Sequence, residues 1–131
     1  MVLDSSAPLA ILLSEPEAPR MVRAIGAAST RLVGVPTLVE TAAVMPGRKG
    51  GAGAIALDAL VLRMGIKAVE MDEDTGRPAR LAYARSGKGV GYPGVLNFGD
   101  CLAHGVAMAG GEPLLFTGTD FAQTDVEAAA W

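Results

Sequence analysis

Residues 1–18, MVLDSSAPLAILLSEPEA, contain the pattern on which the fold depends. The apolar run MVL at 1–3 predicts a short buried strand, and Asp4 follows it directly. Ser6 is placed to cap a helix that has Pro8 in its first turn, and Glu15 with Pro16 interrupts that helix. A strand, an isolated acid and a helix therefore follow one another in one short stretch.

The rest of the chain repeats this alternation of strand and helix. Further strands are predicted at 31–34, 66–70 and 113–118, and further helices at 17–26, 36–45, 52–64, 72–86 and 97–109. Pro46 and Gly47 are expected to end the helix that carries Glu40. This order predicts an α/β fold in a single domain over 1–131, with a mostly parallel central sheet joined by crossover helices.

The composition limits the class of protein. Half of the 131 residues are hydrophobic and 5% are aromatic, which predicts one core packed from aliphatic side chains. A formal net charge of −3 argues against a large basic surface, so any RNA or DNA contact should be local or involve a metal ion. The single cysteine, Cys101, excludes an intramolecular disulfide, and the apolar run at 7–13 is too short for a membrane span. We therefore expect a cytoplasmic protein without membrane contact.

Four acidic residues each stand alone in an uncharged stretch. They are Asp4 in 1–14, Glu40 in 32–47, Asp100 in 89–111 and Asp120 in 113–124. Carboxylates are seldom buried unless they are paired, protonated or bound to a cation, because losing their water costs several kcal/mol or more. The pattern therefore suggests that the four acids share a cation. Asp58 meets the same test within 50–62, but the middle of a predicted helix is a place where a solvated acid needs no partner.

The predicted topology selects among these acids. Ligands of open parallel sheets bind beyond the carboxyl ends of the strands. Asp4 and Asp120 follow strands, directly or by a short turn, whereas Glu40 and Asp100 lie near the starts of helices that reach the same edge. Asp58 has no such position. Local alternatives stay open, since Asp4 and Asp100 also fit helix caps and Asp120 fits a turn, whereas Glu40 has no capping role.

Four converging carboxylates need compensation for their charge. Two of them about 4 Å apart repel by roughly 4 kcal/mol at an effective dielectric constant of about 20, so protons or a divalent cation must offset the repulsion. Oxygen ligands without a histidine or cysteine cluster suit Mg²⁺, or Mn²⁺, rather than structural zinc. Such sites activate water beside phosphate oxygens, which makes phosphodiester hydrolysis the expected reaction.

Several segments resemble a known family: DSSAPLAILLSEPEA at 4–18, LVETA at 38–42, GKG at 87–89, LNFGDCLAHGVA at 96–107 and LLFTGTDFAQTDV at 114–126. They resemble the PIN-domain family, and within it the VapC toxins of bacterial type II toxin–antitoxin modules. The resemblance implies an α/β/α sandwich that forms a homodimer. It implies a Mg²⁺- or Mn²⁺-dependent endoribonuclease that cleaves RNA, often tRNA or a ribosomal RNA loop, and that a cognate VapB antitoxin inhibits.

The resemblance also assigns the site residues. The four catalytic and metal-binding acids of the family match Asp4, Glu40, Asp100 and Asp120. The small hydroxyl residue that orders the first acid matches Ser6. Thr119 departs from the Asp or Asn that is common before the fourth acid, and this departure weakens the assignment of Asp120.

Two further residues lie near the predicted site. His104 stands where relatives often carry Tyr, and a packed core histidine is a simpler role for it than a proton carrier in the acidic pocket. Lys88, in the glycine-rich loop 87–94, is a candidate contact for an RNA phosphate. Two other functions fit the same acids: a catalytically inactive PIN domain that only binds an antitoxin or RNA, and a Mg²⁺-dependent aspartate phosphatase.

Overall fold

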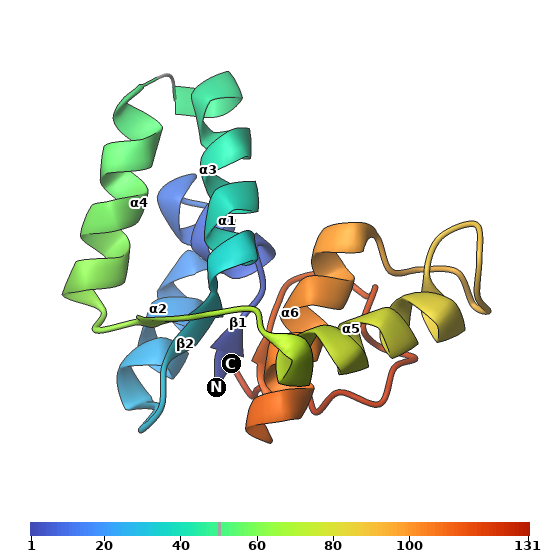
Figure 1. Cartoon of the computed structure of the whole chain (residues 1–131). Helices are drawn as coiled ribbons and strands as arrows, with labels where there is room; N and C mark the ends of the chain where they lie inside the picture. The colour runs from blue at the N-terminus through green and yellow to red at the C-terminus, as the bar shows by residue number, and fades with distance from the viewer. Residues whose placement is uncertain (50) are drawn as a thin grey trace.

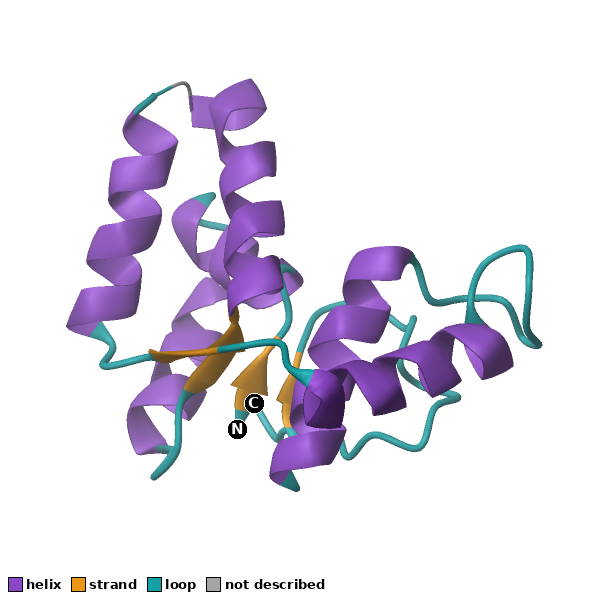
Figure 2. Cartoon of the chain, viewed as in Figure 1, coloured by secondary structure: helices purple, strands orange, loops and turns teal. Residues whose placement is uncertain are grey.

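A four-stranded parallel sheet forms the centre of the molecule (Figures 1 and 2). The structure, a computed structural model, describes residues 1–49 and 51–131, and of 46–49 only the backbone. The strand order is β3-β2-β1-β4, made by β1 (Val2–Leu3), β2 (Leu32–Gly34), β3 (Lys67–Val69) and β4 (Leu114–Leu115). Val2 pairs with Leu32 on one side and Leu114 on the other, so β1 is an internal strand, as its apolar sequence predicts.

The described helices lie around this sheet. They are α1 (Ser6–Leu12), α2 (Ala18–Ala27), α3 (Val35–Lys49), α4 (Ala52–Arg63), α5 (Glu73–Ser86) and α6 (Phe98–Gly110). In Figure 1, α1 and α2 lie on one side of the sheet, α5 and α6 lie on the other, and α3 and α4 project together as an antiparallel pair. No helix within residues 1–49 and 51–131 has the length and apolar composition that crossing a bilayer requires.

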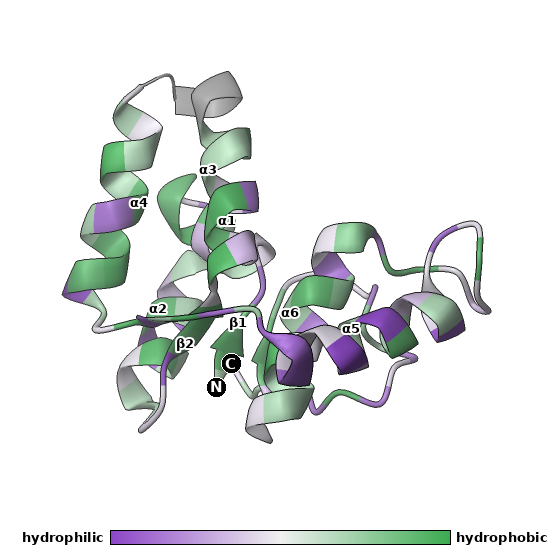
Figure 3. Ribbon diagram, in the orientation of Figure 1, coloured by the Kyte–Doolittle hydropathy of each residue, from purple (hydrophilic) through white to green (hydrophobic). Residues whose placement is uncertain are grey.

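Alternate residues of the strands supply the two layers of the core. Val2 and Leu114 belong to a buried cluster with residues of α5 and α6, whereas Leu3 and Leu115 belong to a cluster with residues of α1 and α2. Successive strand residues point to opposite faces, so a two-residue strand contacts both layers. Figure 3 shows β1 as apolar and α5 as largely hydrophilic. The predicted α/β/α sandwich is confirmed.

Close contact with α5 fixes the position of α6. A Cβ added at Gly105 of α6 would collide with the backbone carbonyl oxygen of Thr75 in α5. Only glycine lets the two backbones approach this far. The contact matters for function because the first turn of α6 contains Asp100.

Two local predictions are wrong. Ser6 is the first residue of α1 rather than its cap, and Ser5 at the cap position makes no capping bond with its side chain. α3 continues past Pro46 to Lys49, so the proline, although it lacks a backbone N–H, does not end the helix. The remaining predicted helices and strands are all found, with shorter strands than expected.

Candidate functional site

Asp4 lies at the carboxyl end of β1, and its side chain is 3% exposed. Its Oδ2 accepts two hydrogen bonds from Ser6, from the backbone N–H at 2.9 Å and from the hydroxyl at 2.6 Å. The Ser6 hydroxyl accepts in turn from the backbone N–H of Thr117, beyond β4, at 3.0 Å. Through these bonds Ser6 links Asp4 to the segment that follows the neighbouring strand β4.

The second oxygen of Asp4 has no partner. Oδ1 is buried and forms no hydrogen bond within the described part of the chain. Buried polar atoms without a partner are rare because desolvation of the atom is left uncompensated. A carboxylate oxygen in this state fits a divalent cation, for which it is a preferred ligand.

Asp100 occupies the first turn of α6, where it forms a capping box with Asn97. The backbone N–H of Asn97 donates to Asp100 Oδ2 at 2.6 Å, and the backbone N–H of Asp100 donates to Asn97 Oδ1 at 2.9 Å. Asp100 is nevertheless 7% exposed. The capping bond occupies one of its two oxygens, so capping and metal binding, the two roles left open by the sequence, are compatible.

The pKa of Asp100 is raised to about 6, chiefly because burial disfavours the charged form. The backbone hydrogen bond from Asn97 lowers this pKa, the charges of Asp4 and Asp120 raise it, and the charge of Lys88 lowers it. The third acid is therefore within electrostatic reach of the first and the fourth. Lys88, an exposed side chain of the glycine-rich loop, belongs to the same environment.

Glu40 approaches the site from α3, and it is partly buried. Its carboxylate lies against the backbone of Gly99, so close that a Cβ at position 99 would collide with both carboxylate oxygens. Burial raises the pKa of Glu40, a hydrogen bond with Ser5 lowers it, and the charge of Asp4 raises it. Gly99 thus makes the space in which the second acid lies beside the first turn of α6.

Asp120 is the most peripheral of the predicted acids. It lies, exposed, in the turn after β4, where the backbone N–H of Ala122 donates to the carbonyl of Thr119 at 3.0 Å. Its charge nonetheless acts on Asp100. Asp58 is exposed on α4, as expected for a solvated acid.

The sheet edge thus brings the four predicted acids into one electrostatic environment. Asp4 acts on Glu40 and on Asp100, and Asp120 acts on Asp100. No three acidic, histidine or cysteine side chains in residues 1–49 and 51–131 lie close enough to hold one metal ion as they stand. Carboxylates repel one another, which favours separations too large for a shared ion, and a divalent cation would offset that repulsion. The donor set is made of carboxylate oxygens, which suits Mg²⁺ or Mn²⁺.

His104 does not take part in this set. It is 3% exposed in α6, and its Nε2 lies 2.8 Å from Oδ1 of Asp125. Arg85 donates to Oδ2 of the same carboxylate at 3.3 Å. A packed histidine, the simpler of the two roles considered from the sequence, agrees with this burial. Its partner Asp125 was not anticipated, because the turn 119–125 gives no local indication of a contact with α6.

A comparison with family models finds the PIN domain over residues 1–127. This chain belongs to the PIN-domain family. Curated relatives similar to it are named VapC ribonucleases. This chain is 41% identical over 130 residues to ribonuclease VapC30 of Mycobacterium tuberculosis strain H37Rv, and the match covers 99% of this chain and 98% of that protein. It is also 41% identical over 128 residues to ribonuclease VapC of Mycolicibacterium smegmatis, with 98% of each chain covered.

The PIN fold is also found among solved structures. The crystal structure of Mycobacterium tuberculosis VapC20, described as a sarcin-ricin loop cleaving toxin, matches with a TM-score of 0.75 and covers 95% of each chain. The two sequences are 16% identical, so this match is a statement about the fold alone. The predicted fold and family are confirmed.

Proposed function

We propose that this PIN domain, acting as one unit over 1–131, is a metal-dependent endoribonuclease toxin of the VapC type, hydrolysing phosphodiester bonds in RNA. The observation that carries the proposal is Asp4, whose buried Oδ1 has no partner among the described residues, at an edge shared with other acids. The relatives that are 41% identical are named as ribonucleases, which supports the reaction class. Transfer RNA and ribosomal RNA are the proposed substrates, and the cytoplasm is the proposed place of action.

Asp4, Glu40 and Asp100 are the proposed principal metal ligands and catalytic acids, with Asp120 completing the set from the turn after β4. These carboxylates would hold Mg²⁺, or Mn²⁺ in its place, which would supply positive charge beside the phosphate and lower the pKa of a water molecule there. Each protein group has a distinct task. Ser6 donates to one oxygen of Asp4, while the other has no partner in residues 1–49 and 51–131, and Gly99 gives the Glu40 carboxylate its space.

Two groups around the acids are suited to positioning the substrate. Lys88 is an exposed cation within electrostatic reach of Asp100, so it is placed to pair with an RNA phosphate beside the acids. Asp100, with its pKa near 6, is largely ionised at neutral pH, and a cation beside it favours the ionised form further. The chain therefore offers anionic ligands and a separate cationic contact at one edge.

An apolar groove next to Glu40 is the proposed place for an inhibiting partner. The groove has a volume of about 660 Å³, and its lining includes Val35, Val39 and Phe98, which are 42%, 64% and 71% exposed. VapC toxins pair with VapB antitoxins, and a VapB segment in this groove would cover Glu40. We also infer a homodimer. Val39→Asp should weaken inhibition by an antitoxin encoded immediately upstream, while cleavage by the isolated toxin stays intact.

RNA cleavage by the purified chain tests the proposed function. Total RNA should be cut at discrete sites with Mg²⁺ and left intact with EDTA. Asp4→Asn should abolish cleavage because it removes an anionic ligand, whereas Asp58→Asn, a matched change on the exposed face of α4, should not. Full Mg²⁺-dependent cleavage by folded Asp4→Asn would overturn the assignment. Binding of RNA without any cleavage by the wild type would favour an inactive binding module instead.

A further inference from the structure

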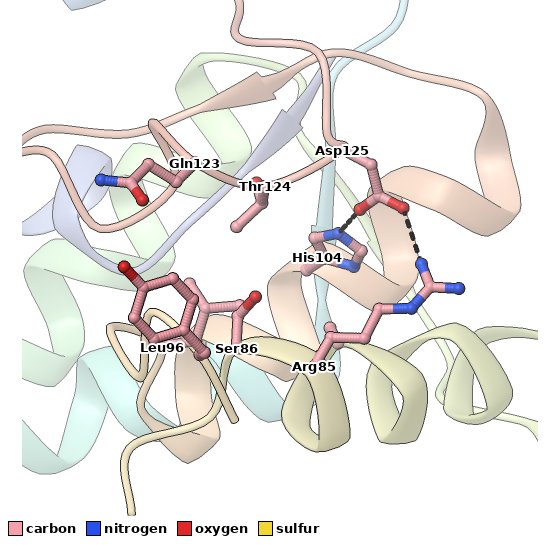
Figure 4. A pocket seen from close by; sticks show the side chains of 9 residues that line it. Arg85, Ser86, Leu96, His104, Gln123, Thr124 and Asp125 are labelled. Atoms are coloured by element: carbon pink, nitrogen blue, oxygen red, sulfur yellow. Dashed lines mark hydrogen bonds and ion pairs between the residues drawn. The ribbon is translucent and has the colours of Figure 1, made fainter. Parts of the chain in front are cut away.

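A cavity of about 280 Å³ lies between α5, α6 and the turn that precedes Val126 (Figure 4). This volume is just below the range for small-molecule sites, about 300–1,000 Å³. Figure 4 shows Gln123 and Thr124 along one side and Arg85 and Ser86 along the other. Three lining residues, Ala82, Ser86 and Leu96, are at most 8% exposed and make a buried floor. The cavity is sized for one small planar group.

The carboxylate of Asp125 is held in a fixed orientation at this cavity. One oxygen accepts from His104 and the other from Arg85, as the dashed lines in Figure 4 show. The hydrogen bond from His104 is the largest cause that lowers the pKa of Asp125, so the group is ionised at neutral pH. An ionised carboxylate has about four acceptor positions, and two of them remain for a ligand. The side chain is 53% exposed, which leaves these positions accessible.

An ionised acceptor at this position selects the chemistry of the ligand. Arg85 pairs with part of its charge, and its remaining acceptor positions bind groups that present N–H donors. Among the four RNA bases, guanine presents two adjacent donors, N1–H and the 2-amino group, that match the two oxygens of one carboxylate. Adenine and cytosine place an acceptor beside their amino group, and uracil has one N–H between two carbonyls.

Tyr92 supplies an aromatic surface at the same cavity. It lines the cavity from loop 87–94, and it is 92% exposed. An almost fully exposed aromatic ring contributes little to the core, whereas aromatic side chains are the usual stacking partners of unpaired RNA bases. The cavity therefore combines a stacking surface with a fixed acceptor.

The cavity shares two segments with the acidic site, α6 and the turn after β4, and the loop that contains Lys88 borders both. α6 contains Asp100 and, one turn later, His104. The turn after β4 contains Asp120 and then the lining residues 123–125. Ser86 and Leu96 are joined by a backbone hydrogen bond of 2.9 Å, and the next such bond, of 2.8 Å, joins Leu96 to Lys88. The cavity therefore lies one helical turn along α6 from Asp100.

We propose that this cavity binds one unpaired base of the RNA substrate, with preference for guanine, beside the cleavage site. The assignment rests on the proposed ribonuclease function for its substrate. Tyr92 stacks on the base, and Asp125 accepts from its donor edge. His104 and Arg85 act as positioning residues, since they orient Asp125.

Titration with single nucleosides, followed by NMR in EDTA, tests the cavity without requiring cleavage. Guanosine should shift the backbone signals of residues 86, 92 and 123–125 at millimolar concentration, and should bind about 5-fold tighter than uridine. Tyr92→Ala should weaken guanosine binding about 10-fold, because stacking is lost. Asp125→Asn should remove the preference for guanosine over adenosine. Val90→Ala, an exposed residue of the same loop outside the cavity lining, should bind guanosine as the wild type does.

The possible outcomes distinguish failure of the proposed guanine site from failure of the proposed nuclease function. Equal affinity for the four nucleosides, no binding at all, or binding unaffected by Tyr92→Ala would overturn the guanine site even if RNA is cleaved. Guanosine binding with the predicted variant effects, in a chain that leaves RNA intact with Mg²⁺, would support the site and overturn the proposed nuclease. Because Tyr92 is 92% exposed, its substitution does not put the fold at risk.

Discussion

Helices α5 and α6 begin with the same hydrogen-bonding device in two different settings. At α5, the Asp72 side chain accepts from the backbone N–H of Thr75 at 3.0 Å, and the Thr75 hydroxyl accepts from the backbone N–H of Asp72 at 2.8 Å. At α6, Asn97 and Asp100 exchange the corresponding bonds at 2.9 and 2.6 Å. Both helices therefore have a complete capping box.

The electrostatics of the two caps are opposite. Asp72 is exposed, and the backbone hydrogen bond from Thr75 is the largest cause that lowers its pKa. Asp100 is buried near two other acids, and its pKa is raised to about 6. The local bonds are alike, so the difference comes from what the fold places around each carboxylate. The charge of Asp72 is stabilised locally, so this residue serves the helix alone. The charge of Asp100 is destabilised by its surroundings, and a bound cation would stabilise it.

Removing the charge of the capping acid, Asp100 in α6 or Asp72 in α5, should give the largest difference in RNA cleavage between two matched variants. Asp100→Asn should lower Mg²⁺-dependent RNA cleavage by at least about 100-fold, because a proposed anionic ligand is lost. Asp72→Asn keeps a cap and lies outside the site, so its cleavage rate should match the wild type. Single-turnover cleavage of one RNA measures both. Equal losses in the two variants would show that Asp100 serves only as a helix cap.

The stability of the metal-free protein should respond to pH in opposite directions at the two caps. The folded pKa of Asp100 is raised from 3.8 to about 6, so its stabilising contribution is present below about pH 4 and is lost as the pH rises through 6. The loss amounts to about 3 kcal/mol of unfolding free energy, and Asp100→Asn should remove it. The pKa of Asp72 is lowered, so its stabilising contribution is present at pH values above its ordinary pKa and is lost as the pH falls.

Urea unfolding in EDTA at a series of pH values, on the wild type and both variants, measures these contributions. Asp100→Asn should be the more stable protein at pH 7. Identical pH profiles for the wild type and Asp100→Asn would contradict the burial of an ionisable Asp100.

A smaller effect on RNA cleavage is expected where the Glu40 carboxylate lies against the first turn of α6. Gly99→Ala places a methyl group where the Glu40 carboxylate lies, and we expect cleavage to fall about 10-fold as Glu40 is displaced. Gly26→Ala is the control, because a Cβ there meets nothing within 4 Å in α2. That change should raise stability by about 0.5–1 kcal/mol and leave cleavage unchanged. A Gly99→Ala protein with wild-type kcat/KM would remove Glu40 from the proposed set.

The smallest effect concerns two exposed cations, Lys88 in the loop that follows α5 and Arg77 within α5. Lys88→Ala should reduce the slope of log binding constant against log salt concentration by about 0.7, the value for one contact to a single strand. Arg77→Ala, in the exposed surface of α5, should leave the slope unchanged. RNA binding in EDTA across a range of NaCl concentrations measures both. An unchanged slope in Lys88→Ala excludes the phosphate contact.

The sequence predicts what depends on neighbouring residues. The strand before Asp4 follows from a short apolar run, and the Asn97–Asp100 cap follows from a three-residue spacing. It also predicts that the isolated acids reach one edge, since the strands run parallel.

Contacts between distant segments were not predictable in the same way. The Glu40 carboxylate meets Gly99, and His104 meets Asp125, only because α3, α6 and the turn after β4 pack together. Ser6 shows the limit most clearly. Its position favours a helix cap, yet its hydroxyl donates to Asp4, two residues earlier, and accepts from the backbone of Thr117, which only the tertiary structure brings near.

The position of β1 between β2 and β4 has a consequence for the time at which the protein becomes active. During synthesis, residues 1–40 leave the ribosome early, and β1 can pair with β2 at once. Its other neighbour, β4, and the fourth acid emerge only after residue 114. The acidic set thus stays incomplete while most of the chain is being made. If the proposed function holds, the ribosome, itself built largely of RNA, finishes most of this chain before the chain can cut RNA.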